Sequence, residues 1–183
     1  MIETIIIFKF MPESIHHKVL IFVIIVIHYI SDTFNSRINS TIAVTAGKWY
    51  AEFKFVHVSN TNTSSTVGVA YADVAANLNP TTGTRSDVSL RMDRSLFNNG
   101  SETSTYSASI SNGDIIGIAL DMDNKKVYFS VNGTFANSSD PANGTNSISI
   151  ADSNSSDNSM VFNCRPLDEK IQANFGNPTF SIS

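Results

Sequence analysis

The chain has 183 residues, enough for one domain of ordinary size with its own core. Its net charge is −4 and its few lysines and arginines are scattered, so it lacks the basic face that nucleic-acid binding requires. A single cysteine, Cys164, excludes an internal disulfide. Nucleic acid is therefore excluded as a partner, and a disulfide framework is excluded as the basis of the fold.

Residues 1–30 differ from the rest because Ile, Val, Phe and His dominate them. The apolar run 19–27 is shorter than the ~20 residues of a membrane-spanning helix. Lys18 before the run fits a signal peptide or membrane anchor, but no small-x-small cleavage site follows. Its β-branched residues favour a buried strand, and an upstream-extended start is the remaining alternative. We predict that deleting residues 1–30 leaves a soluble domain, 31–183.

Beyond Ser31 the sequence is rich in Ser, Thr and Asn, and apolar residues alternate with polar ones from Lys48 onward. This period of two is typical of strands with one buried face. The run 115–120 is instead continuously apolar, which is typical of a strand buried on both faces. The predicted strands cover 48–55, 67–71, 88–92, 115–120, 127–131, 148–150, 160–164 and 171–175. No stretch beyond Ser31 shows a helical period, so the fold class is all-β.

Four Asn-Gly pairs punctuate these strands, at 99–100, 112–113, 132–133 and 143–144. Asn tolerates positive φ and Gly adopts it freely, so the pair favours tight turns between neighbouring antiparallel strands. Many short strands with such turns predict a two-layer antiparallel β-sandwich.

Four segments carry a resemblance to a known family. They are 47–53 (GKWYAEF), 112–123 (NGDIIGIALDMD), 127–133 (VYFSVNG) and 173–180 (ANFGNPTF). In this order they resemble the SPRY domain family. The chain also resembles the version in tailed-phage structural proteins, at 40–42 (STI), 98–100 (NNG) and 138–141 (SSDP). The chain departs from the family at 124–126 (NKK), where relatives have Asn-Gly, and at 88–92, where relatives have a Tyr-rich strand.

The resemblance implies a bent, concanavalin-like sandwich over residues 31–183 that binds a partner through loops at one end, without catalysis or a cofactor. It implies a protein or peptide as partner. We expect a protein or cell-surface glycan as ligand, in a phage virion or host-attachment structure, with a homo-oligomer or virion assembly as an option. A carbohydrate-active enzyme or lectin on a similar sandwich, and a purely structural virion decoration, are the alternatives.

Few residues are candidates for catalysis or metal binding. Asp121 and Asp123 share one face of a strand and could hold Ca²⁺ or act as an acid/base pair, but capping of a hairpin is the simpler interpretation. The remaining candidates are weaker still: Glu52, Glu102 and Glu169 lack a paired spacing, His16, His17 and His28 lie in the N-terminal segment, and His57 ends a strand. We therefore predict no catalytic and no metal site. Trp49 and Cys164 are predicted to belong to the core.

The candidate binding residues are Tyr71, Arg85, Arg91 and Arg94, in the longest span without a family motif, 71–99. Tyr and Arg are enriched among the anchors of protein interfaces. The alternative is a solvated surface that Asp87 and Asp93 neutralise. Apolar residues at 88, 90 and 92 are expected to dock this span onto a sheet. We expect that alanine at all three arginines weakens partner binding by ~1 kcal/mol or more without unfolding the domain.

Overall fold

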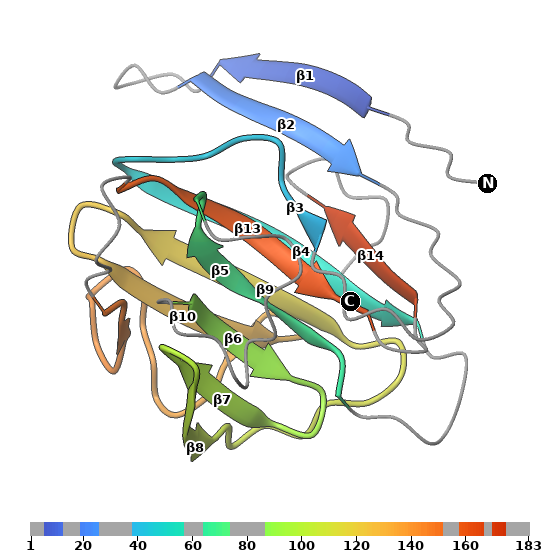
Figure 1. Ribbon diagram of the computed structural model, residues 1–183, viewed down its shortest axis with the longest axis vertical. Helices are drawn as coiled ribbons and strands as arrows, with labels where there is room; N and C mark the ends of the chain where they lie inside the picture. Colours follow the sequence, from blue (N-terminus) through green and yellow to red (C-terminus); the bar gives the residue numbers. More distant parts are fainter. Residues whose placement is uncertain are drawn as a thin grey trace.

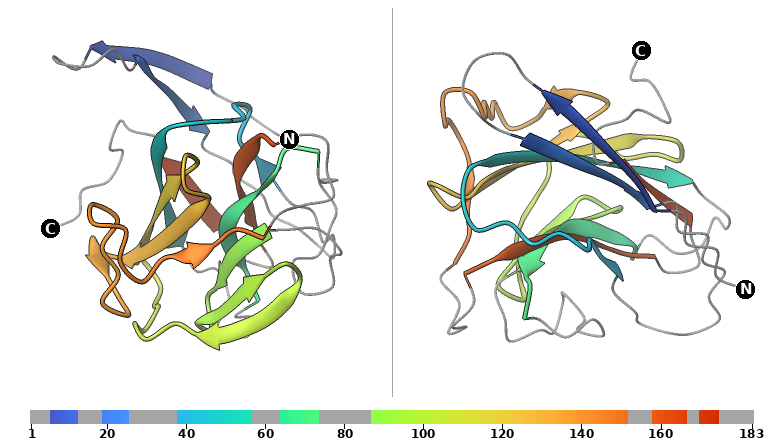
Figure 2. Two further views of the ribbon diagram at one scale, coloured as in Figure 1. Left: turned by 90° about the vertical axis from the view of Figure 1, so that its left-hand side faces the viewer. Right: turned by 90° about the horizontal axis from the view of Figure 1, so that it is seen from above.

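The computed structural model describes residues 6–12, 19–25, 38–56, 64–73, 87–151, 158–166 and 170–174. Within these ranges every regular element is a strand (Figure 1). Two antiparallel sheets pack face to face, as the view from above shows (Figure 2). The predicted antiparallel β-sandwich is therefore confirmed.

The first sheet, sheet I, runs in the order β11-β10-β9-β4-β14, with β12 also paired to β10. Its strands are β4 (Lys48–Val56), β9 (Ile115–Asp121), β10 (Lys126–Val131), β11 (Thr134–Phe135), β12 (Ile148–Ser149) and β14 (Lys170–Asn174). The second sheet, sheet II, runs in the order β3-β13-β5-β6-β7-β8. Its strands are β3 (Ile38–Asn39), β5 (Thr66–Tyr71), β6 (Asp87–Arg91), β7 (Ser95–Asn98), β8 (Ser101–Thr105) and β13 (Met160–Arg165).

The core lies between the sheets and follows the predicted alternation. On β4, Ala51, Phe53 and Phe55 are buried and face sheet II, whereas Trp49 is half-buried at the edge of the same cluster. On β6, Val88 and Leu90 are fully buried, and Met92 just beyond the strand is nearly so. The span 88–92 thus docks onto the core as predicted.

Two of the Asn-Gly pairs form two-residue hairpin turns. Asn99 and Gly100 both have positive φ (54° and 74°) and join β7 to β8. Asn132 and Gly133 (49° and 79°) join β10 to β11 in the same way. Two successive positive φ values match the right-handed twist of the strands they join, which is why Asn-Gly is preferred there.

The apolar N-terminal segment contains a separate hairpin, β1 (Ile6–Pro12) paired with β2 (Val19–Ile25). Strand β2 lies next to β14, and Figure 1 shows the hairpin beside the sandwich. The β-branched run therefore adopts a strand over 19–25, and no helix among the described residues is long and apolar enough to cross a membrane. The dispensability of residues 1–30 stays a prediction.

Candidate functional site

The four predicted binding residues lie in different environments. Arg85 lies outside the described residues. Tyr71 ends β5 with only 1% of its surface exposed, and its hydroxyl donates a hydrogen bond to the carbonyl oxygen of Ala151 (3.3 Å). Arg91 and Arg94 belong to the hairpin between β6 and β7, so the structure brings these two together. Little of Tyr71 is left for a partner to touch, and its role in binding stays a prediction.

Arg91 is held by its own hairpin. Its guanidinium contacts both carboxylate oxygens of Asp93, at 2.8 Å from Nε and 2.6 Å from Nη2, and donates to the hydroxyl of Ser95 at 3.1 Å. The Asp93 carboxylate also accepts from the Ser95 backbone N–H at 2.9 Å. Because this two-point contact fixes the carboxylate and neutralises it, Arg91 and Asp93 add no net charge to the surface. For Arg91, therefore, the structure agrees with the alternative stated from the sequence, a solvated surface in which an aspartate neutralises the arginine.

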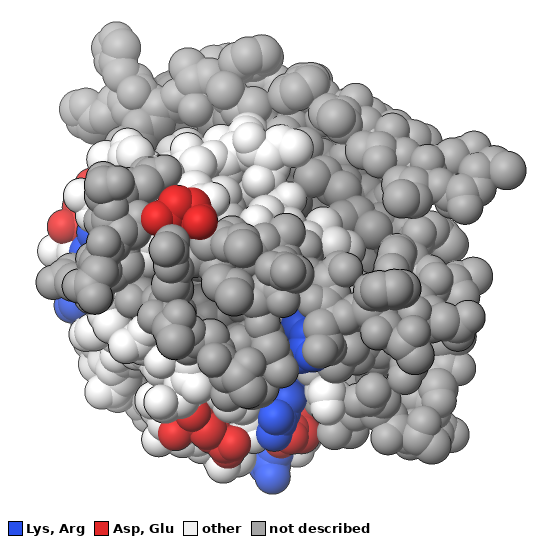
Figure 3. All heavy atoms as spheres, viewed as in Figure 1, with Lys and Arg blue, Asp and Glu red and all other residues white. Residues whose placement is uncertain are grey.

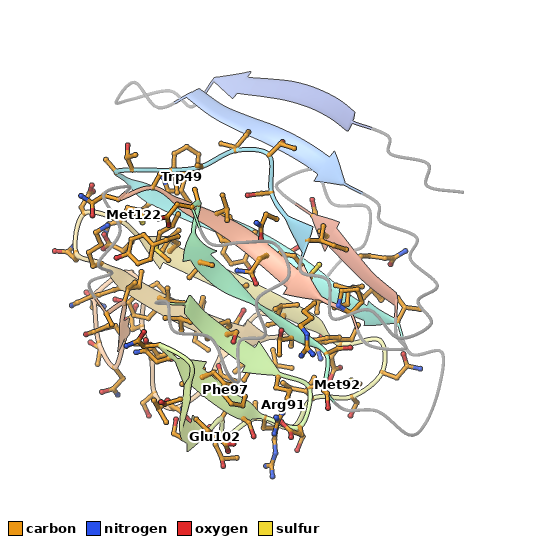
Figure 4. The ribbon with its side chains drawn as sticks, viewed as in Figure 1. Trp49, Arg91, Met92, Phe97, Glu102 and Met122 are labelled. Atoms are coloured by element: carbon orange, nitrogen blue, oxygen red, sulfur yellow. The ribbon has the colours of Figure 1, made fainter. Side chains whose placement is uncertain are left out.

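An aromatic side chain and a second carboxylate complete this cluster. The Arg91 guanidinium lies 5.0 Å from the centroid of the Phe97 ring, within the range of a cation–π contact. The Ser95 hydroxyl donates to Glu102 on β8 at 3.0 Å. Figure 4 shows Arg91, Phe97 and Glu102 together near the ends of β6, β7 and β8, remote from Trp49. Figure 3 shows acidic and basic side chains gathered at this end of the molecule.

Arg94 has a different geometry. It follows Met92 and Asp93 in a three-residue hairpin loop, its N–H donates to the Arg91 carbonyl (2.8 Å), and its φ is 77°. Such loops end in a residue of left-handed conformation, a position that favours glycine. Arg94 is exposed, and its guanidinium has no hydrogen bond or ion pair with any described residue. The hairpin therefore holds a charged side chain in solvent at a cost in backbone strain.

We expect Arg94→Gly to raise the free energy of unfolding by about 0.5–1 kcal/mol, because glycine adopts positive φ without a steric penalty. Urea unfolding of the two chains measures the difference. Asn99→Gly is the matched control, since Asn tolerates this conformation and should gain less. A midpoint for Arg94→Gly at or below that of the native chain would contradict the assigned strain.

Sequence reasoning missed a second cluster, on the outer face of sheet I. Tyr50 and Glu52 alternate with the core residues of β4 and so point away from sheet II. The Tyr50 hydroxyl donates to one Glu52 oxygen (3.3 Å), and the side-chain amide of Asn174 on β14 donates to the other (3.2 Å). Burial and the nearby Glu52 charge raise the pKa of Tyr50, so its hydroxyl remains a donor. The available signal was the shared polar face of residues 50, 52 and 54.

The two aspartates weighed as a metal or acid/base pair both accept hydrogen bonds from within the protein, Asp121 inside the β9–β10 hairpin and Asp123 from the segment before β4. Asp121 accepts from the backbone and side-chain amides of Asn124 (3.0 and 2.9 Å) and lies 3.4 Å from Lys48 Nζ. Asp123 accepts from the backbone N–H of Gly47 at 2.7 Å. Lys125 adopts the left-handed conformation (φ 53°) in this turn, at the segment where the chain departs from the family's Asn-Gly. Asp121 therefore caps the hairpin turn, as the simpler interpretation predicts, whereas Asp123 caps an amide that lies just before β4.

Asp121 should make stability depend on acid pH. Burial acts to raise its pKa, but the Asn124 hydrogen bonds and the Lys48 charge together lower it below its ordinary value. A lowered folded-state pKa contributes stability above the unfolded-state pKa of about 3.9, and this contribution is lost as pH falls through the lower, folded-state pKa. We expect Asp121→Asn to destabilise the domain at pH 7 and to differ less from the native chain at pH 3. An equal difference at both pH values, in urea unfolding, would contradict this.

The single thiol should be inert in the folded protein. Cys164 on β13 is buried against the core, and burial raises its pKa to about 12. Because only the thiolate reacts, a thiol reagent at pH 8 should label Cys164 only after denaturant is added. Labelling of the folded chain at the rate seen in denaturant would show that this strand opens readily. The predicted core position of Cys164 is confirmed.

Comparisons with known proteins agree with this geometry. The SPRY domain family model matches residues 48–141. A crystal structure of the SPRY domain of human HERC1 is 20% identical, covering 79% of this chain and 86% of that chain with a TM-score of 0.58. Another human SPRY domain is 15% identical, covering 83% and 92%, with a TM-score of 0.62. The comparison with curated proteins finds no match.

The family model spans the strands from β4 to β11, including the motif residues Trp49, Glu52 and Gly117. The two solved structures extend the likeness in fold to most of the sandwich. SPRY domains are in general protein–protein interaction modules and are typically not catalytic. The chain belongs to the SPRY domain family.

Proposed function

We propose that this SPRY domain is a non-catalytic module that binds a protein partner through the β6–β8 surface, defined as Arg91, Asp93, Arg94 and Glu102. The observation that carries the proposal is Arg94, an exposed arginine at a turn position that favours glycine. Strained residues persist where the surrounding structure holds them and are concentrated at functional sites.

The charge pattern of this surface supports a partner with a carboxylate. The Arg91 charge is matched by Asp93, so Arg94 is the cation left for another molecule among the described residues of the hairpin. A guanidinium presents parallel N–H donors that pair with both oxygens of a carboxylate. Phe97 and the Arg91 contacts hold the hairpin beneath Arg94, which lowers the entropy lost on binding.

Photo-crosslinking tests where the partner binds. A photoreactive side chain replaces Ser104, which is exposed on β8, and in a control chain it replaces Asn124, which is exposed in the β9–β10 hairpin. Both chains are mixed with extract of the source organism and irradiated. We expect a protein adduct from position 104 that Arg94→Ala weakens and that position 124 does not give. An adduct at position 104 that Arg94→Ala leaves unchanged would rule out this surface.

We further propose that the domain binds its partner as part of a phage particle or host-attachment structure. The support is the sequence alone, namely the segments 40–42, 98–100 and 138–141. The identity of neighbouring genes tests this setting directly. We expect genes for tail or fibre proteins on both sides. Genes for cellular signalling proteins in their place would contradict the virion setting but would leave the proposal of protein binding unaffected.

A further inference from the structure

The outer face of sheet I presents an aromatic ring to solvent. Tyr50 is the exposed large hydrophobic side chain among the described residues, at 45% of its surface. It lies on β4 between Trp49 and Ala51, which face the core, so it points away from sheet II. An exposed aromatic side chain on a rigid strand is suited to contact a ligand at low cost in conformational entropy.

The Tyr50 ring lies along the sheet. A Cβ atom built on Gly117 of β9 would be only 2.3 Å from the Tyr50 hydroxyl oxygen and 3.0 Å from its Cζ. Tyr50 itself pairs with Ala119, two residues further along β9, so its ring reaches back across the sheet. Glycine at position 117 leaves the space for this contact. The hydroxyl end of the ring therefore lies beside Gly117 of β9, while 45% of the Tyr50 surface is exposed.

A fixed hydrogen-bond acceptor lies beside the ring. The two oxygens of the Glu52 carboxylate each accept one hydrogen bond, from Tyr50 and from Asn174. A carboxylate has about four lone-pair sites, so acceptor capacity remains for hydroxyl donors of a ligand. Because two partners from β4 and β14 already orient Glu52, a ligand does not have to order it.

The lysines of this face whose side chains the structure describes are engaged within the protein. Lys48 lies 3.4 Å from Asp121, Lys126 Nζ donates to the carbonyl of Gly144, and Lys54 also has a partner. A charged ligand would have to displace these contacts. A neutral ligand that has both a flat apolar face and hydroxyl donors could contact the exposed part of Tyr50 and the Glu52 carboxylate without displacing any of these contacts.

We infer that Tyr50, Glu52 and Gly117 form a binding site for neutral carbohydrate on the outer face of sheet I. The apolar face of a pyranose ring would stack on Tyr50, and its hydroxyls would donate to Glu52. The site is separate from the β6–β8 surface, which lies on sheet II, and either proposal can fail without the other.

Calorimetric titration and NMR shift mapping of the full chain test the site. The probes are maltohexaose, cellohexaose, chitohexaose and mannohexaose, all neutral. The variants are Tyr50→Ala, Tyr50→Leu, Tyr50→Phe and Gly117→Ala. Leucine fills the space without offering an aromatic face, phenylalanine keeps the ring, and alanine at 117 displaces the ring without removing any group of the site. Arg94→Ala is the control on the other sheet.

We expect at least one hexasaccharide to bind and to shift the amide signals of residues 50, 52 and 117. Its affinity should fall about tenfold or more in the alanine and leucine variants at position 50 and several-fold in Gly117→Ala, but about threefold or less in Tyr50→Phe. Arg94→Ala should leave it unchanged. Absence of binding to every probe, shifts centred away from Tyr50, or full affinity in Tyr50→Leu would overturn the proposal.

Discussion

Phe53→Ala is expected to lower the free energy of unfolding by about 3–5 kcal/mol. Phe53 is 1% exposed at the centre of β4, where it pairs with Ile116 on one side and Ala173 on the other. Alanine removes the apolar contacts between the two sheets and leaves a cavity that the strands around it cannot close. Domains of this size have a free energy of unfolding of about 5–15 kcal/mol, so this substitution would remove a large part of it.

Urea unfolding followed by tryptophan fluorescence measures this loss, since the single tryptophan is Trp49 on the same strand. Lys54→Ala is the matched control, because Lys54 is the next residue and faces outward. We expect the control to change stability by less than about 1 kcal/mol. A similar loss in both variants would show that β4 does not bury Phe53 as described.

Gly68→Ala is expected to destabilise the domain by about 3 kcal/mol, at the upper end for overpacking. A Cβ on Gly68 would lie 2.2 Å from the carbonyl oxygen of Val88 and 2.8 Å from the Cα of Ser89. Both atoms are backbone, so relief requires β5 and β6 to separate and to lengthen the hydrogen bonds between them. The melting temperature should fall by roughly 6–12 °C.

Gly117→Ala provides the contrast. Its added methyl group would also be 2.3 Å from the nearest atoms, but these are the hydroxyl oxygens of Ser130 and Tyr50, at the ends of side chains. Such groups can move, so we expect a loss of only about 1 kcal/mol. Equal melting temperatures for the two variants would mean that the approach of β5 to β6 is looser than these distances indicate.

Most of the main strands could be predicted because they show apolar residues at every second position, as β4 and β6 do, and β9 could be predicted from its continuous apolar run. Strands β7 and β8 were missed for a physical reason. Ser95–Asn98 is only four residues long, and Ser101–Thr105 is exposed throughout and has no apolar residue. They are held by their neighbours and by the turn at Asn99, and neither interaction leaves a periodic pattern.

The candidate site was predicted only in part. Tyr71 alternates with Val67 and Val69, a signal of the buried position it occupies. The different environments of Arg91 and Arg94 could not be predicted from the sequence. They arise from the conformation of the loop, which places Asp93 against Arg91 and leaves Arg94 exposed to solvent. Tyr50 alternates in the sequence with the apolar residues of its strand, but its contact with Gly117 depends on the pairing of β4 with β9.

The affinity of the purified partner for Arg94 variants tests the central claim most directly. The partner captured by crosslinking is titrated into the native chain, Arg94→Ala, Arg94→Lys and Lys48→Ala, the last being an exposed cation on sheet I. We predict that Arg94→Ala weakens binding about fivefold or more, with a smaller effect for Arg94→Lys and none for Lys48→Ala. Unchanged affinity in Arg94→Ala would contradict recognition through the β6–β8 surface.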